Sequence, residues 1–190
     1  MEELLFQKSF YQVWQLQMQA AAADVQKLDR KMFKDPSLGG VLQSISEKYK
    51  IEVARLQGEM TATRRTEERQ RQDGWGDYRM MKTTWLDVSI PFVGEAETLR
   101  IGPSSMTLLD RRATIGRNTL TISVTDDDRA DAAVQNFKQM VEGNLQTLRT
   151  EYERNKPQLE QAIQQAASQR KAQIEAEDAR DKGRSFRVTN

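Results

Sequence analysis

Residues 2–34 constrain the fold of this chain more than any other segment, because they contain neither glycine nor proline and carry a heptad pattern. The a and d positions of that pattern are occupied by Leu4, Gln7, Tyr11, Trp14, Met18, Ala21, Val25, Leu28 and Met32. All of these except Gln7 are apolar or aromatic, which is typical of one long amphipathic helix. A helix of that length is not stabilised by a small compact body alone. We therefore expect a second helix beside it.

A second helical segment is predicted after a short break at residues 35–40. Pro36 cannot continue a helix, and Gly39 and Gly40 favour a turn. Apolar residues then recur three and four positions apart, at Leu38, Leu42, Ile45, Tyr49, Val53, Leu56 and Met60. Helices joined by so short a connection usually fold back antiparallel. The sequence thus predicts a long, coiled-coil-like helical hairpin over residues 2–72, in a first domain of residues 1–76 that ends at the glycines beside Trp75.

The pattern changes to a period of two in the second predicted domain, residues 77–125. Apolar and polar side chains alternate in two segments, whose apolar members are Leu86, Val88, Ile90 and Phe92, and Leu120, Ile122 and Val124. Such alternation is typical of strands with one buried face. Short strands are also expected at Thr98–Ile101 and Met106–Leu109, with turns at Val93–Glu95 and Ile115–Asn118. Together these segments predict a small, mostly antiparallel sheet.

The third predicted domain, residues 126–190, is a long helix. Asp126, Asp127 and Asp128 come just before its first apolar residues, where a side-chain oxygen can cap the helix and negative charge suits its dipole. Pro157 is expected to break the helix. Phe186 and Val188 are expected to form a last short strand or a binding tail. The predicted fold class is therefore α+β: a helical hairpin, a small sheet and a long broken C-terminal helix.

The composition argues against catalysis. The chain has no cysteine and no histidine, which excludes disulfides, thiolate metal sites and nucleophiles that are activated by histidine. The three aspartates lack the glycine and closing glutamate of an EF-hand loop, and Gly102–Ser105 lacks the pattern of a phosphate-binding loop. We expect a non-catalytic protein that binds neither a metal nor a cofactor.

The charge balance and hydropathy give an expectation about location. There are 29 basic and 28 acidic residues, so no overall field attracts nucleic acid or an anionic membrane. No segment approaches the ~20 apolar residues that a membrane-spanning helix needs. Glu2 and Glu3 stand where a signal peptide would be basic. We expect a cytoplasmic protein without membrane contact.

The heptad stripe of residues 2–34 is the main candidate site. It can form a seam with a partner protein, either a second copy or a different chain, or it can pack on the second helix of its own hairpin. The two interpretations are compatible, because aromatic residues such as Phe10 lie outside the narrow seam. The candidate interface residues are Leu4, Tyr11, Trp14, Met18, Val25, Leu28 and Met32.

A basic cluster near the predicted end of the second helix is a further candidate site. Its members are Arg64, Arg65, Arg69 and Arg71. Such a cluster can bind phosphates of a nucleic acid. Glu67 and Glu68 lie within it, however, and cations near a helix C-terminus are favourable in any protein. We therefore prefer a solvated helix end as the explanation, and nucleic acid is disfavoured as a partner.

The segment Ile90–Ser105 resembles a segment of uncharacterised bacterial proteins that place helices on both sides of it. The resemblance implies a bacterial origin and transfers no catalytic residue. The leading expectation for function is an adaptor or scaffold subunit that binds other protein chains through long amphipathic helices. One alternative is a regulatory or sensing module of a bacterial stress or defence system that binds a ligand or peptide. The other is nucleic-acid binding through the arginine cluster.

Overall fold

The computed structural model describes residues 2–72, 78–106 and 112–183. They form two compact units, each built from segments that are distant in the sequence. Unit 1 comprises residues 1–10 and 51–151, and unit 2 comprises residues 11–50 and 152–190. Helix α3 (Ala130–Lys182) supplies its first residues to unit 1 and the remainder to unit 2.

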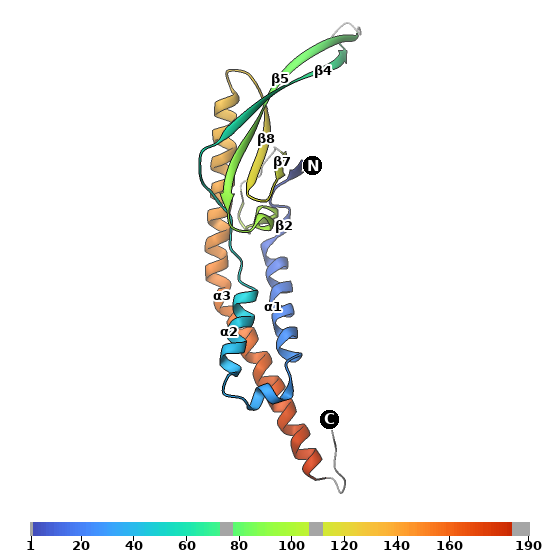
Figure 1. Ribbon diagram of the computed structural model, residues 1–190, viewed down its shortest axis with the longest axis vertical. Coiled ribbons are helices and arrows are strands. Elements are labelled where there is room, and N and C mark those ends of the chain that lie inside the picture. The colour runs from blue at the N-terminus through green and yellow to red at the C-terminus, as the bar shows by residue number, and fades with distance from the viewer. Residues whose placement is uncertain (1, 73–77, 107–111, 184–190) are drawn as a thin grey trace. The chain divides into compact units, whose positions relative to one another are not determined.

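Unit 1 contains an antiparallel sheet with the strand order β1-β7-β8-β5-β3, in which β4 also pairs with β5 (Figure 1). Its strands are β1 (Glu3–Leu4), β3 (Arg55–Leu56), β4 (Thr61–Gln72), β5 (Tyr78–Val93), β7 (Arg112–Ile115) and β8 (Thr119–Thr125). Strands β2 (Lys8–Ser9) and β6 (Ile101–Gly102) form a separate parallel pair. The 3-10 helix η2 (Ala96–Arg100) lies between β5 and β6.

Strands β4 and β5 extend past the rest of the sheet as a ribbon. Their pairing runs from Thr61 opposite Ser89 to Gln72 opposite Tyr78, whereas β8 pairs with β5 from residue 85 to residue 91. Among the described pairings, β4 is thus the only neighbour of residues 78–84, and Figure 1 shows this end projecting from the sheet. Met80 and Met81 on the ribbon are exposed.

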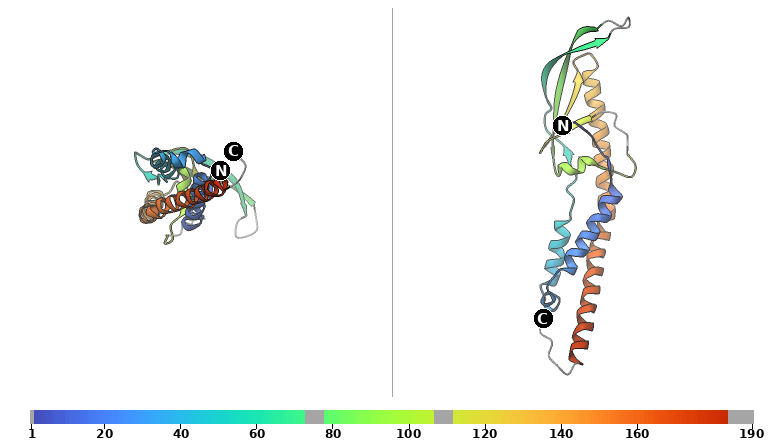
Figure 2. Two further views of the ribbon diagram at one scale, coloured as in Figure 1. Left: turned by 90° about the horizontal axis from the view of Figure 1, so that it is seen from below. Right: turned by 90° about the vertical axis from the view of Figure 1, so that its right-hand side faces the viewer.

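The core of unit 1 lies between the sheet and the first part of α3, which run side by side in Figures 1 and 2. The predicted alternation in β5 and β8 is confirmed, because one face of each strand is buried. The buried residues are Val88, Ile90, Phe92, Leu120, Ile122 and Val124 from the strands and Val134, Phe137, Val141, Leu145 and Leu148 from α3. The alternate residues of the two strands and the residues three and four apart on α3 therefore form one apolar layer.

At two positions in unit 1 the neighbouring backbone lies so close that a side chain would collide with it. Gly94 has φ +93°, and a Cβ there would lie 3.0 Å from the Ala54 Cα, so the predicted turn at Val93–Glu95 requires glycine. At Gly102 a Cβ would lie 2.6 Å from the carbonyl oxygen of Phe6. Phe6 itself has φ 57°, which is strained for an aromatic residue. Its burial and the hydrogen bond from its N–H to the Leu99 oxygen, 2.9 Å long, hold it there.

Unit 2 is helical. It contains α1 (Phe10–Gln26), the 3-10 helix η1 (Arg30–Lys34), α2 (Leu38–Lys48) and the C-terminal part of α3. Helices α1 and α2 run alongside α3 in Figures 1 and 2. The buried apolar residues of the unit are Trp14, Ala21, Val25, Phe33, Leu42, Ile45, Tyr152, Leu159, Ile163, Ala166, Ala167 and Ile174.

The predicted long N-terminal hairpin is wrong. The first helix begins only at Phe10, because residues before it form short strands and bury Leu5 and Phe6 in unit 1. The second helix ends at Lys48, and the residues beyond it pair with β5 as β3 and β4. The Glu, Gln and Arg residues of β4 favour helix in isolation, but pairing with β5 overrides that local preference. A spacing pattern cannot reveal this long-range pairing.

The predicted break of the last helix is also wrong, since α3 continues through Pro157. Proline removes one backbone donor, which leaves the Glu153 carbonyl without its helical partner. Both residues are exposed, so water can satisfy that carbonyl. The predicted strand at Thr98–Ile101 is instead mostly η2, while the turn at Ile115–Asn118 is confirmed between β7 and β8. Predictions for Trp75, Phe186, Val188 and residues 107–109 lie outside the described residues.

Candidate protein-interaction surface

The inner face of α1 belongs to the core of unit 2. Trp14 is 2% exposed, and its ring meets the Tyr152 ring of α3 edge to face, with centroids 5.6 Å apart. Ala21 and Val25 are fully buried on the same side of the helix. The Gln26 side chain adds a hydrogen bond of 3.1 Å to the Ala166 carbonyl oxygen. Trp14, which the heptad pattern placed on the apolar stripe, is thus buried, but its ring partner lies on α3 and not on the second helix.

The remaining candidate interface residues do not share one face. Tyr11 is 68% exposed, and Met18, Leu28 and Met32 are half-buried. Leu4 lies on β1, in unit 1, and is half-buried there. Trp14 and Ala21, which are seven residues apart, both stay on the buried side, whereas Tyr11 and Met18 lie at its edge or outside it. The predicted stripe therefore divides between core and surface.

An apolar surface lies on the opposite side of α1. Leu16 is 65% exposed, and Ala20 and Ala23 follow it one and two turns later as exposed residues. Gln12 and Gln19, both exposed, flank this stripe. We call these residues, Gln12, Leu16, Gln19, Ala20 and Ala23, the α1 outer face. The heptad frame that runs through Trp14 does not include this face.

The α1 outer face carries no charge. No Asp, Glu, Lys or Arg occurs between Lys8 and Asp24, although charged residues make up 30% of the chain. Surface helices of monomeric proteins usually place charged residues on the side opposite the core. Central parts of protein interfaces, in contrast, are depleted of charge. The length of this uncharged segment was the signal in the sequence that could have indicated the surface.

Charged groups instead gather where α1 ends. The Asp24 carboxylate accepts hydrogen bonds from Lys48 Nζ at 2.6 Å and from the Tyr49 hydroxyl at 2.8 Å. The bond from Lys48, followed by that from Tyr49, lowers the pKa of Asp24 below its ordinary value. These contacts join the end of α1 to the end of α2. They fix the helices of unit 2 without placing charge on the α1 outer face.

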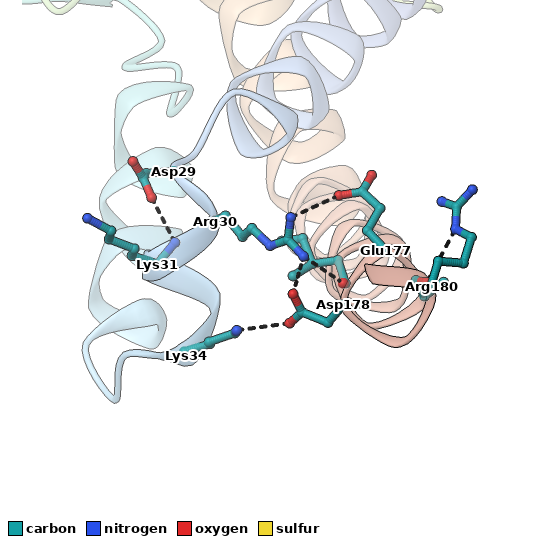
Figure 3. Close-up of polar contacts among 9 residues, drawn as sticks. Asp29, Arg30, Lys31, Lys34, Glu177, Asp178 and Arg180 are labelled. Carbon is teal, nitrogen blue, oxygen red and sulfur yellow. Dashed lines mark hydrogen bonds and ion pairs between the residues drawn. The ribbon is translucent and has the colours of Figure 1, made fainter. Parts of the chain in front are cut away.

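A second ionic cluster joins η1 to α3 (Figure 3). Arg30 forms ion pairs with Glu177, at 3.4 Å, and with Asp178, and it donates a hydrogen bond to the Ile174 carbonyl oxygen at 3.3 Å. Lys34 Nζ lies 2.9 Å from the other oxygen of Asp178. Bonds from Lys34 and Arg30 lower the pKa of Asp178. These acids and bases are satisfied by one another, which favours a structural role for the cluster.

The arginines proposed to contact nucleic acid lie on strand β4 and not at a helix end. Arg64 pairs with Asp126 at 2.7 Å. Arg65 pairs with Asp87 at 2.8 Å and with Glu67, and its guanidinium lies over the Trp85 ring. Carboxylates thus neutralise both guanidinium groups. The side chains of Arg69 and Arg71 fall outside the described residues.

Asp127 holds the turn that precedes α3. Asp127 accepts hydrogen bonds from the Arg129 N–H and from the Thr125 hydroxyl, both at 2.9 Å. The bond from the Arg129 backbone is the main reason that the pKa of Asp127 is lowered. Within the described ranges, no three acidic side chains are grouped closely enough to hold a metal ion.

Comparisons with known proteins add no relative: no family model, no curated protein and no solved structure matches this chain. None of the helices among the described residues combines the length and the apolar character required to cross a bilayer.

Proposed function

We propose that this chain is a non-catalytic structural or adaptor subunit that self-associates through the α1 outer face. The observation that carries the proposal is the exposure of Leu16, Ala20 and Ala23 on a helix segment without charge. An exposed apolar stripe of this kind gains stability when it is covered. Alanine side chains let a second helix approach closely, because they project little from the backbone.

A second copy of the same face is the occupant that the chemistry favours. In a two-fold interface each residue meets the same surface of the partner, so any charge near the axis would meet its own like charge. The α1 outer face contains glutamine, leucine and alanine only, so two copies meet without repulsion. Glutamine side chains at the rim can donate and accept hydrogen bonds with their own kind.

Light scattering during gel filtration tests this proposal directly. The wild-type chain should show a mass above the 21.9 kDa of one chain at tens of micromolar. Leu16→Glu or Ala20→Glu should reduce that mass to one chain and leave the helical circular dichroism unchanged. Ala172→Glu, a matched change at an exposed alanine of α3, should keep the larger mass.

A charge-reversal pair makes the test specific for self-association. Leu16→Glu and Leu16→Lys should each be monomeric, since like charges would face each other across the two-fold axis. A mixture of the two variants should regain the larger mass. A wild-type chain that is monomeric at these concentrations would disprove self-association, and so would a larger mass that survives every change on the α1 outer face.

A further inference from the structure

Unit 1 contains a cavity between β3 and α3 that the proposed self-association does not use. Its volume is about 340 Å³, within the range of cavities that bind small molecules. It is lined by Arg55, Leu56, Glu142, Leu145, Gln146 and Arg149. Two arginines and two leucines thus face one small space.

The Arg149 guanidinium is held in place, but not all of its N–H groups have acceptors in the described part of the chain. One terminal nitrogen donates to the Gln146 side-chain oxygen, and the other donates to the Ala54 carbonyl oxygen at 3.4 Å. Its Nε is buried and has no acceptor among the residues that the structure describes. Each of the two terminal nitrogens has a second N–H beyond the one that it donates here.

Among the described residues, neither arginine of the cavity has a close carboxylate partner. Burial and, second, the nearby charge of Arg55 lower the pKa of Arg149. Across the described ranges, no carboxylate lies within 4.0 Å of a nitrogen of either guanidinium, and Glu142 at the edge is engaged with Lys138 at 3.9 Å. In this respect the pair differs from Arg64 and Arg65, whose charges carboxylates neutralise.

We propose that this cavity binds a small oxyanion, a carboxylate or a phosphate, between Arg55 and Arg149. An oxyanion there would accept hydrogen bonds from the terminal N–H groups of Arg55 and Arg149 and would lie between two like charges. The planar guanidinium fork matches both types of anion. The half-buried Leu56 adds apolar surface, which favours a carboxylate that carries a short alkyl chain over a bare inorganic ion. This proposal is independent of the α1 outer face.

Calorimetric titration of the full chain with butyrate and, separately, with inorganic phosphate tests the cavity. Saturable one-to-one binding of either anion supports the proposal, and the tighter of the two identifies the ligand class. Arg55→Gln should weaken binding about tenfold, the usual effect of losing one charge-assisted bond. Arg117→Gln, the same charge change at an exposed turn, should bind like the wild type.

The melting temperature of Arg55→Gln without ligand shows whether Arg55 serves binding or stabilises the fold. Arg55 is exposed, and its removal relieves repulsion, so Arg55→Gln should melt at or above the temperature of the wild type without ligand. Arg149→Lys keeps the charge but loses the fork, so it should also bind weakly. The proposal is overturned if neither anion binds saturably, or if Arg55→Gln and Arg117→Gln weaken binding equally.

Discussion

The two units of this chain treat charged side chains in different ways. In unit 1, opposite charges from distant positions are in contact: Arg65 and Asp87 on the paired strands β4 and β5, and Arg100 of η2 with Glu3 of β1. In unit 2, the ion pairs lie at the ends of α1, η1 and α2, and the middle of α1 carries no charge. Paired strands can thus neutralise the charges on their own surface, while a helix can leave one side without charge.

The largest expected effect tests whether the inner face of α1 is core. Trp14→Ala should lower the free energy of unfolding by about 3–5 kcal/mol, because it removes a buried aromatic ring against Tyr152. Leu16→Ala, on the exposed side, should change the unfolding of a single chain by no more than about 0.5 kcal/mol. Denaturant titrations at low protein concentration measure both. If both variants lost the same free energy of unfolding, the two faces of α1 would not differ in burial.

A second effect should appear in unit 1. Gly94→Ala should destabilise the chain by about 1–3 kcal/mol, the usual range for strain at a left-handed position. The added Cβ would also press on the Ala54 backbone at 3.0 Å. Gly39→Ala provides the control, since nothing lies within 4 Å of a Cβ there and alanine favours helix α2. Thermal melts of both variants should move in opposite directions, and a neutral Gly94→Ala would contradict the turn geometry.

A smaller, pH-dependent effect should come from the end of α1. Lys48 and Tyr49 lower the pKa of Asp24 in the folded state, so this carboxylate stabilises the fold above its unfolded pKa. That contribution is lost as the pH falls through the lowered folded pKa. The melting temperatures of the wild type and Asp24→Asn should therefore differ at neutral pH and converge in acid. A difference that grows in acid would have the wrong sign.

The smallest effect is expected at the start of α3. Asp127→Asn should change stability little, because the asparagine side-chain oxygen can still accept from the Arg129 N–H. Calorimetry of the wild type with Mg²⁺, Ca²⁺ and Zn²⁺ should show no binding tighter than about millimolar, the weak end for carboxylate sites. Micromolar binding that disappears in Asp127→Asn would show that these aspartates are a metal site.

Local patterns in the sequence were sufficient for part of this structure. Alternation at Leu86–Phe92 and Leu120–Val124 predicted strands, because a strand with one buried face must alternate whatever its partner is. The turn at Gly94 was predicted for the same reason, since it depends on neighbours in the chain. Asp127, predicted to cap the last helix, instead accepts from Arg129, which precedes α3. The burial of Trp14 followed from its place on an amphipathic helix.

What the sequence alone determined is thus the set of features that rest on a few neighbouring residues: strands β5 and β8, the inner side of α1 and the absence of charge from its outer side. Tertiary structure decided the rest. Residues 61–72 became a strand because β5 offers a long free edge, and Arg55 and Arg149 meet because β3 lies beside α3. Hydrogen bonding and packing between strands stabilise the extended conformation by more than the local preference of the residues favours a helix. The spacing of residues along the chain does not reveal such long-range pairing.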